Sequence, residues 1–430
     1  MKLCAILLLA LPLAGVSFYV KDQQFRFPES HERCKVEKMC DFEEHRSGDG
    51  HDFSINFVEV RGDGSYFDKG QLDRALAQIQ AATHGGAQKP LVFIYVHGWH
   101  NNAGELDNKG RECPDLKGDV AKFRDCGLAE LARQYPTVKG APPAVVGIYL
   151  AWQGMDFTPA GLVTYIVPSY ILRRYGATRV GMTMMRDALD QILLRTIGKN
   201  RDQHVVALMG HSFGARVLEN AAEVLDPLRV KGRAVAERPP ADLIFYVNAA
   251  SSNTISRRTI RDWNKSCRET PNNPVCGQDP FYLGVSSRTD FATGLVQPIA
   301  TLAFFWYPTS VKPLRFELVP FSAANSFWMH THYDPKNLKE KPCPDPHTSS
   351  VCFFVPQVPK AGKPPYADTF NVEPHRNVKT RFWLLNTGRR FIRNHGDVWN
   401  PKVFAMVHEV LRQNSSYDAA RRDNEKAGAR

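Results

Sequence analysis

Features typical of proteins that have no large packed core are absent from the sequence. It has no internal repeat and no low-complexity tract, which excludes repeat arrays and long disordered regions. After residue 20 it has no apolar run long enough to cross a bilayer. At 430 residues, of which 43% are hydrophobic, the chain can instead bury a large globular core.

A sustained basic block is also missing, although the chain carries 55 Lys and Arg against 44 Asp and Glu, a net charge of +11. The basic residues are scattered, and the two densest stretches, 257–268 and 419–430, are typical of solvated surface. We therefore expect no nucleic-acid partner. Weak attraction to a membrane surface or to lipid stays open.

The N-terminus has a composition of its own. "MKLCAILLLALPLAGVSFYV" has one lysine, then an apolar run too short for a typical membrane span, then small residues. This order predicts a signal peptide over residues 1–17, cleaved after Ser17, and therefore an exported protein, periplasmic or secreted. An uncleaved membrane anchor is the alternative.

The CxxC spacing of zinc ligands is absent among the nine cysteines. Setting aside Cys4, eight cysteines fall into four close couples, as expected for disulfides between neighbours in an oxidising compartment. Free thiols in a cytosolic protein are the alternative. The simplest pairs are Cys34–Cys40, Cys113–Cys126, Cys267–Cys276 and Cys343–Cys352.

From residue 51 onward, continuous apolar strands alternate with amphipathic helices, whereas residues 18–50 form a polar, cysteine-bearing extension. Such alternation predicts an α/β fold with a mostly parallel central sheet flanked by helices. The expected strands are 53–60, 90–99, 144–154, 204–210, 241–250, 281–290 and 381–386. The expected helices are 69–83, 177–197, 215–228 and 401–413.

Three long loops, 100–140, 252–280 and 308–378, interrupt this pattern, and each carries one of the cysteine couples. A disulfide within a long loop helps to order it. Loops of this length on a rigid sheet usually shape a binding site, although inert decoration is the alternative.

The segment "LMGHSFGAR" places Ser212 between Gly210 and Gly214, after an apolar strand and before an amphipathic helix. A strand that ends in Gly-X-Ser-X-Gly and turns at once into a helix strains the serine and presents its hydroxyl at the helix N-terminus. This context predicts a nucleophile. A serine with only a structural role in the turn is the alternative.

A serine nucleophile needs an oxyanion hole, and "FIYVHGWHNNAG" offers one at the end of another apolar strand. The turn His97-Gly98-Trp99 can aim the backbone N–H of Trp99 at the oxyanion, beside the N–H of Phe213. The alternative is an ordinary turn in which His97 and His100 bond to neighbouring loops.

These two motifs resemble the α/β hydrolases, and within them a bacterial esterase-like and lipase-like group that reads approximately "VFVHGFNN" and "GHSMGA" at these places. The likeness spans residues 53–415, but only the short motifs are specific. The resemblance implies a catalytic triad in the chain order Ser, acid, His. It also implies that Gly210, His211 and Gly214 support the elbow, and that His97 and Gly98 support the oxyanion turn.

The acid of that triad is expected after a strand that follows the elbow. "YLGVSSRTDFATG" places Asp290 just beyond such a strand, downstream of the elbow by more than one strand-helix unit. Three rivals are Asp262, Asp279 and Asp334, of which the first two flank a cysteine couple in a polar loop.

The base is expected near the C-terminus. "RRFIRNHGDVWNPKVF" places His395 in a loop after the last strand and directly before the last apolar helix, with Asp397 as a loop-stabilising neighbour. In the triad, His395 deprotonates Ser212, and Asp290 orients the imidazole. The rival histidines are His330, His332, His347 and His375 in the long insertion and His408 in the helix.

These assignments predict an exported serine hydrolase that cleaves carboxylic esters of a small molecule or lipid, with no cofactor. The alternatives are a lipase, phospholipase, acyltransferase or peptidase with the same triad, or a non-catalytic binding protein on a hydrolase scaffold. A metal at "MHTHYD" is a further alternative, but we expect none. The apolar stretches 161–172 and 301–308 fit an acyl pocket or lid, and fit core packing equally well.

Overall fold

The computed structural model describes the parts of the chain on which the fold and the candidate site depend. The described ranges are 23–46, 51–113, 115–154, 166–221, 241–251, 281–296, 331–338, 351–356, 367–374, 382–413 and 415–428. The short helical pieces 256–257, 260–261 and 264–265 are described too.

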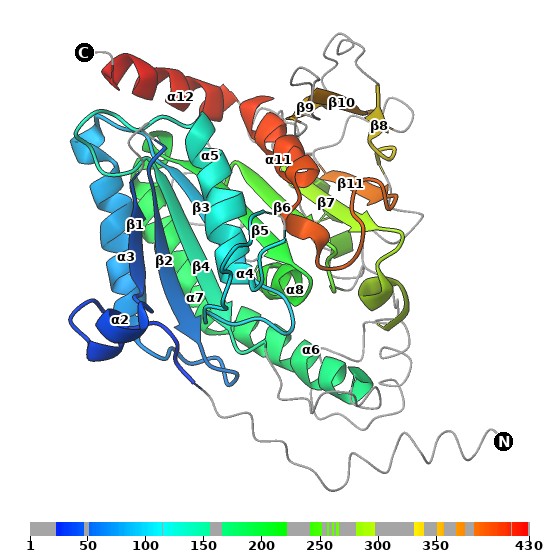
Figure 1. The fold of residues 1–430 in the computed structure, drawn as a ribbon, viewed down its shortest axis with the longest axis horizontal. Helices are drawn as coiled ribbons and strands as arrows, with labels where there is room; N and C mark the ends of the chain where they lie inside the picture. The colour runs from blue at the N-terminus through cyan, green and yellow to red at the C-terminus, as the bar shows by residue number, and fades with distance from the viewer. Residues whose placement is uncertain are drawn as a thin grey trace, which may run out of the picture.

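An eight-stranded sheet forms the centre of the molecule, in the order β1-β2-β4-β3-β5-β6-β7-β11 (Figure 1). Strand β1 pairs antiparallel with β2 at one edge, and every other neighbouring pair is parallel. The strands are β1 Phe42–His45, β2 Phe53–Val60, β3 Leu91–Val96, β4 Val145–Trp152, β5 Val205–His211, β6 Leu243–Val247, β7 Tyr282–Ser287 and β11 Phe382–Thr387.

The parallel strands are buried along almost their whole length because both faces of the sheet are covered. Alternate residues of one strand enter different cores: Phe53, Ile55 and Phe57 lie in one, and Val58 and Val60 lie in the other. The predicted α/β architecture, a mostly parallel central sheet flanked by helices, is confirmed.

Helices cover both faces of the sheet (Figure 1). One face packs against α4 Asp119–Ala121, α5 Ala129–Gln134, α11 Pro401–Gln413 and α12 Ser415–Gly428. The other packs against α3 Lys69–Ala82, α6 Ile166–Met182, α7 Met184–Leu189 and α8 Phe213–Asn220. Helix α11 has the bounds that its apolar spacing predicts, and α3 differs from its expected range by one residue.

The single helix expected over residues 177–197 is wrong. Helix α6 starts earlier, ends at Met182, and is followed by α7 and by a π-helical segment Asp190–Thr196. The break falls at Thr183, which has non-helical backbone angles and whose hydroxyl donates to the carbonyl of Arg179 at 2.9 Å. A side chain hydroxyl that bonds back to the preceding turn competes with continued helix, which apolar spacing does not report.

Parts of the long loops are regular. The range 100–140 contains α4, α5 and a π-helical segment Lys122–Leu128 between them. The range 308–378 contains a second sheet in the order β8-β10-β9, built from Lys336–Asn337, Ala367–Val372 and Val351–Pro356. At the C-terminus, α12 replaces the expected solvated tail, because Tyr417, Ala420 and Asn424 are buried on its inner side.

Two of the predicted disulfides are present, Cys34–Cys40 and Cys113–Cys126. Cys352 is also disulfide-bonded, whereas Cys343, Cys267 and Cys276 lie outside the described residues. The predicted signal segment, residues 1–17, and the stretch 301–308 lie outside them too. Among the helices that the structure describes, none has the length and apolar content to cross a membrane.

Candidate active site

Three sequence-predicted residues meet at the carboxyl edge of the sheet. Ser212 follows β5, Asp290 lies three residues beyond β7, and His395 lies in the loop between β11 and α11. Because parallel strands end on the same side, loops that are far apart in sequence come together there. The structure therefore brings together side chains from residues 212, 290 and 395.

The turn at Ser212 is as sharp as the sequence predicts. Ser212 has φ 54° and ψ −120°, a conformation that a non-glycine residue rarely adopts. A Cβ atom at Gly214 would lie 2.0 Å from the carbonyl oxygen of Val96, and one at Gly210 would lie 2.6 Å from the Cα atom of Ala215. Both positions therefore require glycine, because the backbone passes too close to them for a side chain. This close approach lets α8 start directly beside the end of β3.

The three side chains form a hydrogen-bonded chain. The Oγ atom of Ser212 lies 2.8 Å from Nε2 of His395, and Nδ1 of His395 lies 2.8 Å from Oδ2 of Asp290. An ionised carboxylate only accepts hydrogen bonds, so Nδ1 of His395 carries the proton and donates it to Asp290. The remaining nitrogen, Nε2, is then free to accept the hydroxyl proton of Ser212.

Asp290 is almost fully buried and is held by more than the histidine. Its Oδ1 atom accepts from the backbone N–H groups of Ala292 at 2.9 Å and Thr293 at 3.2 Å, and its Oδ2 atom accepts from the Thr293 hydroxyl at 2.5 Å. Burial raises the pKa of Asp290. The charge of His395 and the hydrogen bonds from His395 and Thr293 together lower it by more, so the pKa of Asp290 lies below its ordinary value.

The predicted oxyanion turn is fixed against the elbow. A Cβ atom at Gly98 would lie only 2.8 Å from the Cβ atom of Ser212, so the turn passes directly beside the serine. The ring of His97 is fully buried: its Nε2 accepts from the N–H of Trp152 at 3.2 Å, and its Nδ1 donates to the carbonyl of Gly98 at 2.8 Å. Burial lowers the pKa of His97, which is consistent with a neutral, structural ring.

The two backbone donors assigned to the oxyanion stay a prediction. Phe213 is the first residue of α8, so its N–H has no acceptor within the helix. The indole of Trp99 lies edge-on to the rings of Phe213 and Tyr170, with centroids 6.3 and 5.7 Å away. This packing holds the turn that carries the Trp99 N–H next to the start of α8.

Two residues support the histidine from behind, one of them missed by the sequence analysis. His211 donates from Nε2 to the backbone carbonyl of His395 at 2.9 Å, and Asn248 donates from Nδ2 to the same carbonyl at 3.0 Å. The resemblance placed His211 at the elbow, but no motif points to Asn248. An asparagine directly after an apolar strand was the only available signal.

The rival residues that the structure describes have other partners. Asp334 accepts from the N–H of Gly388, and Asp397 pairs with Arg393 within the same loop. The ring of His332 packs on Trp383. His408 lies 3.1 Å from the Tyr417 hydroxyl. The rivals outside the described residues are Asp262, Asp279, His330, His347 and His375.

No three His, Cys, Asp or Glu side chains in the described ranges are grouped so as to hold a metal ion.

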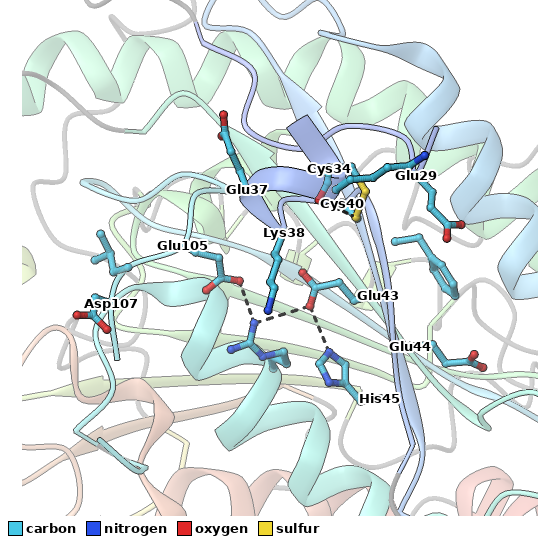
Figure 2. A pocket seen from close by; sticks show the side chains of 14 residues that line it. Glu29, Cys34, Glu37, Lys38, Cys40, Glu43, Glu44, His45, Glu105 and Asp107 are labelled. Atoms are coloured by element: carbon cyan, nitrogen blue, oxygen red, sulfur yellow. Dashed lines mark hydrogen bonds and ion pairs between the residues drawn. A yellow bond between two sulfur atoms is a disulfide. The ribbon is translucent and has the colours of Figure 1, made fainter. Parts of the chain in front are cut away.

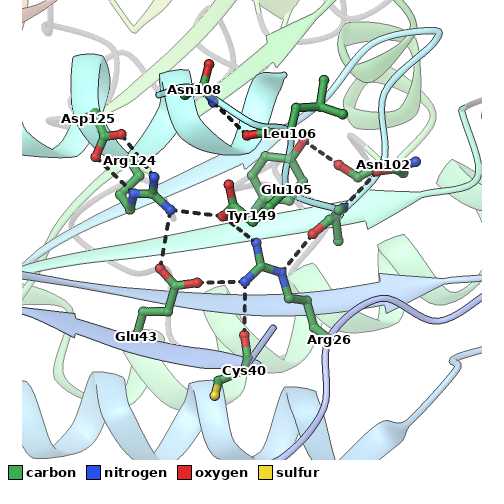
Figure 3. Close-up of polar contacts among 12 residues, drawn as sticks. Arg26, Cys40, Glu43, Asn102, Glu105, Leu106, Asn108, Arg124, Asp125 and Tyr149 are labelled. Carbon is green, nitrogen blue, oxygen red and sulfur yellow. Dashed lines mark hydrogen bonds and ion pairs between the residues drawn. The ribbon is translucent and has the colours of Figure 1, made fainter. Parts of the chain in front are cut away.

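A ring of four charges braces the segment that follows the predicted oxyanion turn (Figure 3). Arg26 pairs with Glu43 at 2.6 Å and with Glu105 at 2.8 Å, and Arg124 pairs with Glu105 at 2.9 Å and with Glu43 at 3.7 Å. The side chain of Arg26 is fully buried, and those of the other three are 17–24% exposed. Each charge therefore has two opposite neighbours, which offsets the cost of burial.

This ring, which we call the Arg26 brace, ties the N-terminal extension to the central sheet. Arg26 donates from Nε to the carbonyl of Ala103 at 2.7 Å, and its backbone N–H donates to Glu59 at 2.8 Å. Its guanidinium also lies 3.8 Å from the ring centroid of Phe57 on β2. The extension is thus part of the packed structure on the oxyanion side.

Beside the Arg26 brace lies an open groove of about 1070 Å³, shown in Figure 2. Both carboxylates and cations line it, and the disulfide Cys34–Cys40 forms part of its wall. None of its lining residues belongs to the Ser212, Asp290 and His395 chain. The groove is therefore separate from the candidate active site.

Comparisons with known proteins give only distant likenesses. No protein-family model and no curated protein matches the sequence. Among solved structures, phospholipase PlaB from Legionella pneumophila in complex with thio-NAD is similar at 13% identity and a TM-score of 0.30, over 79% of this chain and 62% of that one. An uncharacterized protein from Pseudomonas aeruginosa is similar at 12% identity and a TM-score of 0.24, over 55% and 42%. The chain thus spans less than two thirds of the phospholipase.

Proposed function

We propose that this protein is an exported serine hydrolase that cleaves carboxylic esters, with Ser212 as nucleophile, His395 as general base and Asp290 as the orienting acid. The observation that carries the proposal is the chain of two 2.8 Å contacts through His395, set behind a strained serine. A base within hydrogen-bonding reach of the hydroxyl, itself oriented by a third group, is the geometry that activates a serine.

In the proposed reaction, Ser212 Oγ attacks the ester carbonyl while its proton moves to Nε2 of His395. The negative charge on the carbonyl oxygen is stabilised by the N–H groups of Trp99 and Phe213 and by the N-terminus of α8. The imidazolium then donates its proton to the departing alcohol, which leaves an acyl group on Ser212. Water, activated by His395, hydrolyses this acyl-enzyme and regenerates the serine.

The disulfides support the export part of the proposal, because such bonds persist in oxidising compartments. The same proposal assigns residues 1–17 to a signal peptide and 18–50 to an extension. Residues 51–430 would then form one catalytic domain.

A lipid ester is the second candidate substrate. Phe291 follows the acid directly, and 64% of this phenylalanine is exposed. An aromatic ring that faces solvent beside the site is suited to contact with an apolar chain or a lipid surface. A membrane surface is thus a candidate partner, and we propose neither a nucleic-acid partner nor a cofactor.

The experiment that tests this function is labelling of the purified protein with a fluorophosphonate probe, beside a Ser212→Ala variant. We expect labelling of the wild type only, and hydrolysis of p-nitrophenyl esters that falls by about 10⁴-fold or more in the variant. Ester chains of rising length then separate an esterase from a lipase. A folded wild type that neither labels nor hydrolyses any ester would favour a binding protein on a hydrolase scaffold.

A further inference from the structure

The segment that follows β6 touches the backbone around all three members of the proposed triad. The N–H of Ser212 donates to the carbonyl of Val247 at 3.1 Å, and the N–H of Ala250 donates to the carbonyl of Ser212 at 3.0 Å. The strained serine is thus held on both sides of its Cα atom by this one segment. Between these two contacts lies Asn248.

Asn248 connects the same segment to the strand that carries the acid. Its backbone N–H donates to the carbonyl of Val285 at 2.8 Å, and its Oδ1 atom accepts from the N–H of Ser287 at 2.9 Å. Ser287 is the last residue of β7, three positions before Asp290. The side chain of Asn248 therefore fixes the point at which the acid loop leaves the sheet.

The opposite end of the same amide reaches the histidine loop. Nδ2 of Asn248 donates to the carbonyl of Asn394 at 3.2 Å and to the carbonyl of His395 at 3.0 Å. The second carbonyl also accepts from Nε2 of His211. Two donors on one carbonyl leave the His395 backbone little freedom, so the imidazole starts from a fixed Cα atom.

Asn248 is well suited to this place. It is fully buried, and its φ of 46° lies in the left-handed region that asparagine tolerates better than most residues. Its amide has one acceptor, which faces the acid strand, and two donor hydrogens, which face the histidine loop. No other side chain of similar size combines an acceptor and a double donor in this way.

We propose that Asn248 is a positioning residue that sets His395 against Ser212 and Asp290. The inference rests on the proposed hydrolase function. Asn248 does not touch the reacting atoms and acts through the backbone of the histidine loop. A displacement of about 1 Å in a catalytic group can cost about 10²-fold in rate. Loss of the amide should therefore appear in kcat more than in KM.

Two variants test the proposal without forcing the backbone. Asn248→Gly tolerates the left-handed φ and removes all the side-chain bonds. Asn248→Asp keeps the shape and the acceptor for Ser287 but turns the donor into an oxygen that faces two carbonyls. In the full-length protein we expect both to lower kcat for a p-nitrophenyl ester by about 10²-fold, with KM within about threefold. The matched control is Asn371→Gly, because Asn371 is also buried but lies in the small second sheet, and the kcat of this variant should stay within about twofold of the wild type.

A second readout does not depend on turnover. The proton on Nδ1 of His395, held by Asp290, should give a low-field proton resonance that disappears in Asp290→Asn and broadens or disappears in Asn248→Gly. If kcat and this resonance both stay at wild-type levels in the two Asn248 variants, the positioning role is wrong while the hydrolase proposal stands. If the wild type has no esterase activity, the hydrolase proposal fails, and the resonance alone decides whether Asn248 positions His395.

Discussion

The two sides of Ser212 are held in place by different interactions. On the histidine side, neutral buried groups, Asn248 and His211, bond to a backbone carbonyl. On the oxyanion side, the segment after the turn is held by the Arg26 brace and by an extension closed with a disulfide. Both sets of contacts hold the backbone in place. The histidine side does so with neutral hydrogen bonds, and the other side does so with ion pairs.

The difference predicts how each side fails. Neutral hydrogen bonds in a dry interior are directional and insensitive to salt, so their loss should displace the histidine and reduce rate. Partly buried ion pairs contribute mainly to the stability of the folded protein, because removing one partner leaves the opposite charges buried without compensation. We therefore expect changes on the histidine side to affect catalysis, and changes in the Arg26 brace to affect folding.

The largest expected effect comes from exchanging a carboxylate for an amide on each side. Asp290→Asn should lower kcat by about 10⁴-fold, because the amide favours the wrong tautomer of His395, while the melting temperature changes little. Glu43→Gln is the same chemical change in the Arg26 brace, and we expect kcat to fall by less than about tenfold. Steady-state kinetics and thermal melts of both variants check this. Equal losses of rate would contradict the division.

Much of the candidate active site is readable from the sequence, because its signals are local. Continuous apolar runs predict the parallel strands, and the glycines around Ser212 predict the sharp turn. Asp290 and His395 follow from their position after particular strands. Topology then brings these loops to one edge of the sheet, so the fold needs no further information to assemble them.

The supporting contacts are not readable in this way. Asn248 bonds to backbone carbonyls 146 and 147 positions away, and Arg26 pairs with Glu105 across 79 positions. Backbone acceptors leave no trace in residue type, and an ion pair is one of many that the composition allows. Helix α12 is similar, because few apolar side chains mark its buried face.

The next largest effect should come from the centre of the Arg26 brace. Arg26→Met removes the only fully buried cation of the ring and leaves Glu43 and Glu105 in partly buried positions. Breaking a buried pair costs about 3–5 kcal/mol, and we expect the lower end because both carboxylates keep some exposure. Urea denaturation measures the change. A loss of rate beyond about tenfold in folded Arg26→Met would show that the brace also positions the oxyanion donors.

Mild acid should separate the two sides. The pKa of His211 is lowered from 6.5 to about 4, mainly by burial and next by the charge of His395. The folded state then binds fewer protons than the unfolded chain, so stability falls as the pH drops from 6.5 to 4, by about 3 kcal/mol for this residue. His408 acts in the same direction.

Glu43 behaves differently, because its pKa lies below the ordinary 4.5 even though burial opposes this. Hydrogen bonding to His45 and the charges of Arg26 and Arg124 lower it. Its stabilising contribution is present above pH 4.5 and is lost only as the pH falls further. Urea midpoints across this range should decline less steeply in His211→Gln than in the wild type. An unchanged slope would mean that His211 does not titrate as its burial implies.

The smallest effect is expected for an ion pair in the same N-terminal extension. Arg33 and Glu37 lie four positions apart on α2, Glu32–Glu37, with Nε and Oε1 2.9 Å apart and both side chains more than a third exposed. Water and salt screen such a pair, so Arg33→Ala should leave the urea midpoint and kcat unchanged within error. It is the matched control for Arg26→Met, since both variants remove an arginine from the N-terminal extension. If Arg33→Ala destabilised the protein as much as Arg26→Met, stability would depend on docking of the whole extension and not on the buried charges of the Arg26 brace. The contrast between these charges and the neutral hydrogen bonds behind His395 would then be wrong.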